Sequence, residues 1–201
     1  APAGMVMPAP ENLSMEEAAC LPEAFATAYL NLFWEGNAKS GETLLMHAGA
    51  SGLASVVIPM AKAFGLRVIT SVRNAGKKRA IADLGADVII DTSRESVPDI
   101  LRREAERGNP ADIVIDCLGD RVLGECLPFV NKGCRWIVIA TLAGDTSEID
   151  LRTLYMKGIR LIGSTLRSKP QAKKEEILSA LVKTIWPKIE SGALKPTIFA
   201  S

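Results

Sequence analysis

The 201-residue sequence predicts an α/β fold in which a doubly wound, parallel sheet of six strands carries helices on both faces. Two observations lead to it. Short apolar runs alternate with helical patterns from residue 43 to residue 189, as in repeated βαβ units with right-handed crossovers. The first run leads into a turn of small residues, AGASG at 48–52, followed by a helical pattern. Folds that bind dinucleotides begin in this way.

The turn matches the G-x-G-x-x-G/A fingerprint only in part, with Gly49, Ser51 and Ala54 at its three positions. Alanine is tolerated at the third position. Serine at the second adds a hydroxyl that either hydrogen-bonds a ligand or pushes it away. Free N–H groups at the start of the following helix would bind a pyrophosphate. The alternative is a glycine-rich turn that binds no nucleotide.

Each further element has its own signal. Ser14 and Glu17 form a capping box that begins a short helix, and Gly65 ends the helix that follows the turn. Strands are expected at residues 43–47, 67–71, 88–91, 112–117, 135–140 and 160–164. Helices are expected at 16–20, 23–35, 53–64, 77–84, 98–107, 151–156 and 171–189, with one more after a cap at 118–120. The strand order 3-2-1-4-5-6 follows, with a ligand at the switch between strands one and four.

The residues after the second strand indicate the cofactor. An Asp or Glu there would bind the ribose 2′-hydroxyl of NAD, but this chain has Arg73, Asn74 and Lys77 instead. The cations among them, Arg73 and Lys77, would pair with a 2′-phosphate. NADP(H) is therefore favoured over NAD(H), the alternative being a solvated basic helix start.

Composition excludes several classes of function. The formal charge is +1 and basic residues are dispersed, so no nucleic-acid footprint is expected. No apolar run approaches a membrane span, and no signal peptide opens the chain. We expect a soluble, cytoplasmic protein. The first residue is Ala and a Pro-rich stretch follows, so we also expect further sequence to precede this chain.

Cysteine and histidine do not predict a metal site. Cys20, Cys117, Cys126 and Cys134 show no C-x-x-C spacing, so reduced core thiols are expected. His47 ends the first strand and could touch a ligand, but no carboxylate orients it in the sequence, and a structural role is favoured.

Several stretches, in order over nearly the whole chain, carry a resemblance. They are residues 17–25 (EAACLPEAF) with 27–29 (TAY), 47–52 (HAGASG), 84–87 (LGAD), 115–119 (IDCLG), 135–136 (RW) and 163–168 (GSTLRS). In them the chain resembles the NADPH-dependent quinone oxidoreductases of the medium-chain dehydrogenase/reductase superfamily, particularly the tumour-suppressor-inducible type.

The resemblance implies a two-part enzyme. Residues 36–201 would be the NADP(H)-binding Rossmann domain and 1–35 a lead-in from the interdomain region, with most of a GroES-like catalytic domain outside this chain. The enzyme would transfer hydride from NADPH to a quinone or α,β-unsaturated carbonyl, without zinc, as a dimer that pairs sixth strands. This chain would carry no catalytic residue and turn over little alone. By position, the cofactor would be lined by Thr27, Gly49, Ala50, Ser51, Gly52, Leu53, Arg73, Asn74, Lys77, Thr92, Gly119, Leu142, Thr165 and Leu166.

Four positions depart from the family pattern: Ala54, Pro59, Thr92 and Asp120. Pro59 inside a helix removes one hydrogen bond and costs about 3 kcal/mol or a kink. These changes concern affinity more than fold. They leave two alternatives open: a non-catalytic nucleotide-sensing or interaction module, and an enoyl-reductase module of a larger synthase.

Overall fold

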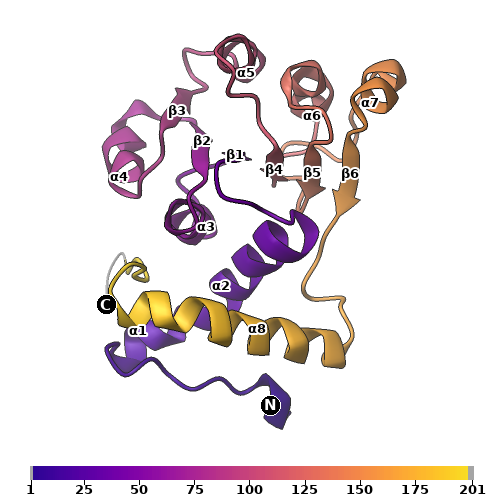
Figure 1. Cartoon of the computed structure of the whole chain (residues 1–201). Coiled ribbons are helices and arrows are strands. Elements are labelled where there is room, and N and C mark those ends of the chain that lie inside the picture. The colour runs from indigo at the N-terminus through magenta and orange to yellow at the C-terminus, as the bar shows by residue number, and fades with distance from the viewer. Residues whose placement is uncertain (1, 199–201) are drawn as a thin grey trace.

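The computed structural model, which describes residues 2–198, contains one parallel sheet of six strands in the order β3-β2-β1-β4-β5-β6 (Figure 1). The predicted fold class and strand order are confirmed. The strands are β1 Thr43–Met46, β2 Arg67–Val72, β3 Val88–Asp91, β4 Ile113–Asp116, β5 Arg135–Val138 and β6 Arg160–Gly163.

The register brings the carboxyl ends of the central strands together. Met46 lies opposite Thr70 on β2 and opposite Ile115 on β4. The turn after β1 therefore has the loops after β2 and β4 as its neighbours. β1 is buried along its whole length, as expected for a strand covered on both faces.

Helices cover both faces of the sheet (Figure 1). They are α1 Met15–Ala19, α2 Leu21–Tyr29, α3 Ala54–Ala63, α4 Lys78–Asp83, α5 Val97–Glu106, α6 Arg121–Cys126, α7 Leu151–Lys157 and α8 Gln171–Glu190. One core joins α2, α3 and α8 to side chains such as Met46 and Ile115. The other joins α5 and α6 to side chains such as Leu45 and Val114. Neighbouring residues of one strand thus enter different cores.

The N-terminal helices follow their sequence signals with one extension. The capping box is present, because the Ser14 hydroxyl accepts from the Glu17 amide and the Glu17 carboxylate accepts from the Ser14 amide. The second helix begins at Leu21 and not at residue 23, since Pro22 fits the first turn, where no N–H is needed. Its last stretch, Leu30–Glu35, is a π-helix, which the sequence pattern did not predict.

The expectation of four core thiols was wrong for Cys20. Cys117, Cys126 and Cys134 are buried, but Cys20 is exposed because it lies at the junction of α1 and α2, where its Sγ contacts the Glu16 carbonyl oxygen. Burial raises the pKa of Cys134 to about 12. The buried thiols are therefore unreactive.

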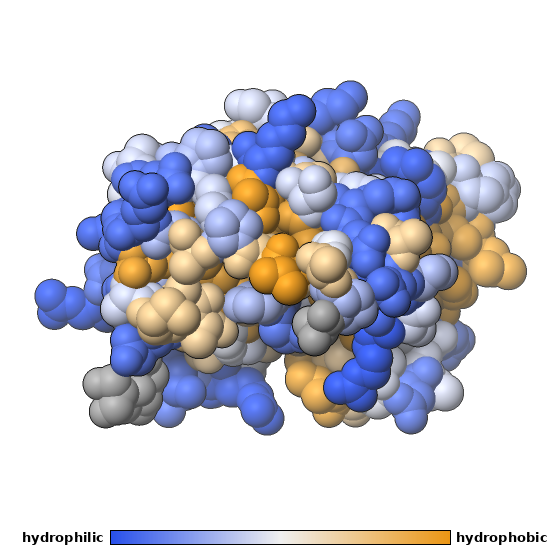
Figure 2. Space-filling model, turned by 90° about the horizontal axis from the view of Figure 1, so that it is seen from below, coloured by the Kyte–Doolittle hydropathy of each residue, from blue (hydrophilic) through white to orange (hydrophobic). Residues whose placement is uncertain are grey.

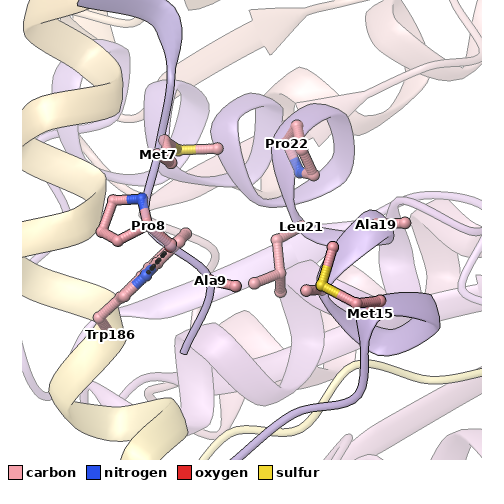
Figure 3. A pocket seen from close by; sticks show the side chains of 9 residues that line it. Met7, Pro8, Ala9, Met15, Ala19, Leu21, Pro22 and Trp186 are labelled. Carbon is pink, nitrogen blue, oxygen red and sulfur yellow. Dashed lines mark hydrogen bonds between the residues drawn. The ribbon is translucent and has the colours of Figure 1, made fainter. Parts of the chain in front are cut away.

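A small apolar cavity of about 200 Å³ is lined by the N-terminal segment and by residues of α1, α2 and α8 (Figure 3). Trp186 on α8 closes one side and donates from its indole nitrogen to the Pro8 carbonyl at 2.8 Å. The remaining lining comes from Met7, Ala9, Met15, Ala18, Ala19, Leu21 and Pro22. Figure 2 shows apolar side chains scattered among charged ones on the underside of the molecule. In the described part of the chain, no helix is both long and apolar enough to cross a membrane.

Candidate functional site

The turn after β1 is closed against β2. Ala48 adopts a positive φ of 54°, and the Gly49 amide donates to the Ser71 carbonyl at 2.8 Å. A side chain at position 49 would overlap the hydroxyl of Thr70, which donates to the Met46 carbonyl at 2.6 Å. Glycine is thus required at position 49 by the approach of β2.

The Ser51 hydroxyl turns toward the helix. It accepts from the Ala54 amide at 3.2 Å, and the Ser51 amide donates to the Ala48 carbonyl at 2.9 Å. Among residues 2–198, the amides of Ala50, Gly52 and Leu53 have no hydrogen-bond partner. These three free N–H groups lie in the turn that leads into the ten-residue helix α3, where free amides can bind an anion.

The loop after β2 presents basic side chains. Arg73 and Lys77 are exposed, and neither forms an ion pair within the described residues. Asn74 instead serves the backbone, since its side-chain oxygen accepts from the Gly76 amide at 2.8 Å. Lys78 faces Glu95 at 3.5 Å. Two free cations therefore lie one strand away from the anion site.

A buried carboxylate organises the loop after β4. One Asp116 oxygen accepts from the amides of Leu118 and Gly119 at 2.8 and 3.1 Å, and the other accepts from the Trp136 indole at 3.0 Å. This network fixes the first turn beyond β4. Gly119 follows with a φ of 64°, and a side chain there would meet the Gly144 carbonyl.

The loops after β4 and β5 are joined by backbone hydrogen bonds. The Leu142 amide donates to Cys117 at 3.0 Å, the Ala143 amide to Leu118 at 2.8 Å, and the Asp120 amide to Gly144 at 3.0 Å. Asp120 begins α6 without a side-chain cap and with φ 56° and ψ −164°. Residues 118–120 thus precede α6 as expected, but no side chain caps the helix. The conformation of Asp120 lies close to the region that only glycine enters readily, and such a conformation costs about 1–3 kcal/mol.

His47 has a structural position. It is fully buried, and its Nδ1 lies 3.3 Å from the Ser71 hydroxyl. Burial lowers its pKa, while the charge of Asp116 acts in the opposite direction. Burial therefore favours the neutral form of the His47 ring.

The other predicted cofactor residues are more dispersed. Thr92 follows β3 and donates from its hydroxyl to the Val72 carbonyl at 3.1 Å. Leu142 follows β5 and is 78% exposed. Thr165 is exposed, and Leu166 is half-buried against the core that contains α2, α3 and α8. Thr27 lies half-buried on α2.

Sequence reasoning missed three residues that shape the site: Thr70, Ser71 and Asp116. All three are polar residues at the ends of apolar strands, and all are buried. A polar residue in an otherwise apolar strand was the available signal, since buried polar groups need partners.

The described residues do not form a metal centre. Among residues 2–198, no three His, Cys, Asp or Glu side chains are grouped to hold an ion. A tetrahedral zinc site needs at least three such ligands.

An anion-binding turn at the switch point of a doubly wound sheet defines a nucleotide-binding α/β domain. The model of the zinc-binding dehydrogenase family matches residues 52–183, and the chain belongs to this family. The zinc in that description has no counterpart in a group of ligands among residues 2–198.

Comparison with known proteins gives the same class. Human quinone oxidoreductase is 27% identical over 190 residues, which are 94% of this chain and 55% of that protein. Lovastatin diketide synthase of Aspergillus terreus is 28% identical over 193 residues, 93% of this chain but 8% of the synthase. The structure of quinone oxidoreductase from Thermus thermophilus, also solved in complex with NADPH, superposes with a TM-score of 0.82 at 27% identity over 98% of this chain and 62% of that one.

These comparisons confirm the resemblance to quinone oxidoreductases of the medium-chain superfamily. The chain is the nucleotide-binding domain of an oxidoreductase of the medium-chain superfamily. It spans little more than half the length of the quinone oxidoreductases it matches.

Proposed function

We propose that this chain binds NADP(H) at the carboxyl edge of its sheet. The observation that carries the proposal is that two candidate phosphate sites lie side by side, one in the turn after β1 and one in the loop after β2. The free amides of Ala50, Gly52 and Leu53 would bind the pyrophosphate. Arg73 and Lys77, exposed at the end of β2, would bind the 2′-phosphate. No carboxylate that would repel this phosphate follows β2 directly.

The remaining contacts are assigned by position. Gly49 lets the turn lie close against β2, and Ser51 orients the helix start. Asn74 and Thr92 would flank the adenosine half. Gly119 and Leu142 would line the nicotinamide half, with Thr165 and Leu166 beyond them and Thr27 approaching from α2. Residues 36–201 would form the cofactor domain, with residues 1–35 as the approach to it.

In the whole protein we propose reduction of a quinone or α,β-unsaturated carbonyl. Bound NADPH supplies the hydride, and this chain contributes the binding and orientation of the nucleotide. Two titratable groups at the ends of β1 and β4 are unavailable for proton transfer, because His47 is buried and Asp116 is committed to three donors. The chain alone is therefore proposed to turn over little. From the resemblance to the zinc-independent quinone oxidoreductases, we propose a reaction that uses no zinc.

We further propose a homodimer that pairs β6 with its copy. β6 is the edge strand of the sheet, and Leu161 on it is 39% exposed. The neighbouring helix α7 exposes Tyr155 and Met156, at 66% and 63%. An unpaired strand edge flanked by apolar side chains favours association. Three buried free thiols suit a reducing compartment, and the cytoplasm is the proposed location.

Calorimetric titration of the chain with NADPH and with NADH tests the central proposal. We expect NADPH to bind more tightly by at least tenfold, the effect of about one charged contact. Equal affinity for the two nucleotides would remove the proposed role of the basic loop, and no binding of either would contradict the nucleotide site altogether.

A second candidate is an enoyl-reductase module of a multidomain synthase. The match to 193 residues of lovastatin diketide synthase favours it. The cofactor site would be the same, so the length of the complete gene product separates the two. The third candidate is a non-catalytic nucleotide-sensing or interaction module. Absence of NADPH binding by a complete protein with a folded far-UV spectrum would favour it.

A further inference from the structure

Asp120 occupies a backbone conformation that suits glycine. Its φ of 56° and ψ of −164° lie at the border of a region that residues with a side chain rarely enter. Gly119 before it also has a positive φ, of 64°. The Asp120 amide is fixed by its bond to the Gly144 carbonyl at 3.0 Å, so the loop cannot relax without separating from the loop after β5.

The side chain of Asp120 has a defined place but no protein partner. It lies over Gly144, where an added methyl group would come within 3.2 Å of the Asp120 Cβ and 3.3 Å of its Oδ1. The carboxylate makes no helix cap. Within residues 2–198 it accepts no hydrogen bond and forms no ion pair. The strain of this residue is therefore not offset by any contact of its carboxylate with the described protein.

The position of the Asp120 carboxylate relative to the proposed nucleotide site limits which groups of NADPH the carboxylate can contact. β4 pairs with β1, so the loop that holds Asp120 lies beside the proposed pyrophosphate turn, on the nicotinamide side of the switch point. A bare carboxylate beside phosphates is repelled unless it accepts a hydrogen bond. The donors next to the pyrophosphate on that side of NADPH are the hydroxyls of the nicotinamide ribose. A carboxylate binds the hydroxyl of the adenosine ribose in many NAD-binding versions of this fold, and a carboxylate can accept from the nicotinamide ribose in the same way.

We propose that the Asp120 carboxylate accepts a hydrogen bond from a hydroxyl of the nicotinamide ribose. The inference rests on the proposed NADP(H) site and adds a residue to it. Asp120 is then a positioning residue for the nicotinamide nucleotide, and its carboxylate strengthens binding.

The test compares Asp120→Gly with Asp120→Asn, titrated with NADPH and with 2′,5′-ADP, which lacks the nicotinamide ribose. Glycine relieves the backbone, so we expect a melting temperature about 2–4 °C higher. We expect NADPH affinity to fall about tenfold through loss of a charged hydrogen bond, and 2′,5′-ADP affinity to stay unchanged. Asparagine keeps an acceptor oxygen and tolerates positive φ, so its loss of NADPH affinity should be smaller.

Asn37→Gly is the matched control. Asn37 also has a positive φ, of 45°, but precedes β1 at the opposite end of the strand, so its replacement should leave both affinities unchanged. Unchanged or tighter NADPH binding by Asp120→Gly would overturn the inference, as would an equal loss for both ligands. Failure of the native chain to bind either ligand would overturn the proposed function and this inference together.

Discussion

The α-carbon of Gly49 faces the hydroxyl of Thr70 with no room for a side chain between them. Thr70 cannot turn away freely, because its hydroxyl donates to the Met46 carbonyl at 2.6 Å. The contact fixes how closely the phosphate turn approaches β2. It therefore couples the two halves of the proposed cofactor site.

Gly49→Ala is expected to destabilise the fold by about 1–3 kcal/mol through overpacking and to weaken NADPH binding. Gly52→Ala is the control, because a side chain there meets no atom within 4 Å. Urea unfolding and calorimetric titration measure both effects. Equal stability of the two variants would contradict the role given to Thr70.

Arg73→Ala and Lys77→Ala are each expected to weaken NADPH binding about tenfold, the effect of losing a charged contact to phosphate. NADH affinity should barely change, because NADH lacks the 2′-phosphate. Lys183→Ala removes an exposed cation from α8 and controls for net charge. A parallel loss for NADPH and NADH would exclude specific recognition of the 2′-phosphate.

Stability is expected to fall as the pH drops below about 6.5, the ordinary pKa of histidine. Burial lowers the pKa of His47 in the folded chain, against the smaller effect of Asp116. The unfolded chain thus takes up this proton first, and the free energy of unfolding decreases by about 1.4 kcal/mol per unit of difference between the two pKa values. Above about pH 6.5, His47 is neutral in both states and its full contribution to the free energy of unfolding is present.

His47→Gln should flatten this dependence between about pH 6.5 and 5, measured by denaturant unfolding at each pH. Carboxylates titrate below about pH 4.5, outside this window. An unchanged slope in the variant would show that His47 does not cause the acid sensitivity.

Pro59→Ala should stabilise the protein. α3 runs from Ala54 to Ala63 through this proline, which supplies no N–H for the Ser55 carbonyl. Restoring the donor is expected to raise the free energy of unfolding by about 1–3 kcal/mol, less whatever packing the ring provides. Pro22→Ala is the control, since Pro22 lies in the first turn of α2, where no donor is needed. A stabilisation no larger than that of the control would mean that α3 already compensates for the missing bond.

Self-association through β6 is expected to be lost in Leu161→Lys, because a buried charge at a strand edge opposes pairing. Sedimentation velocity should show a dimer for the native chain and a monomer for this variant. Val6→Lys changes an equally apolar side chain, 67% exposed on the N-terminal segment, and should remain dimeric. A monomeric native chain would contradict the proposed interface.

The sheet was predictable because its signals are local. The run at β3, Val88–Asp91, was predicted with the same bounds that the structure gives, since an apolar run between turn residues specifies a buried strand. Parallel strands joined by helices then have few possible orders. The helix stop at Gly65, with a φ of 77°, likewise follows from the residue itself.

The details of the site depend on contacts between distant residues. The hydroxyl of Ser51 had two possible partners in the sequence, a ligand or the chain, and the structure shows it bound to the Ala54 amide. Asp116 read as one more strand residue, because its indole partner, Trp136, is 20 positions away. The exposure of Cys20 depends on how α1 meets α2. Local periodicity carries no information on such pairings.

The closed turn at residues 48–51 has a consequence for the energetics of association. Its hydrogen bonds, from Gly49 to Ser71 and from Ser51 to Ala48, form within the protein itself. A mobile loop loses conformational entropy when it binds a ligand, but this turn has already lost that entropy on folding. Nucleotide capture at this turn should therefore be a rigid-body encounter, with affinity set by complementarity and desolvation.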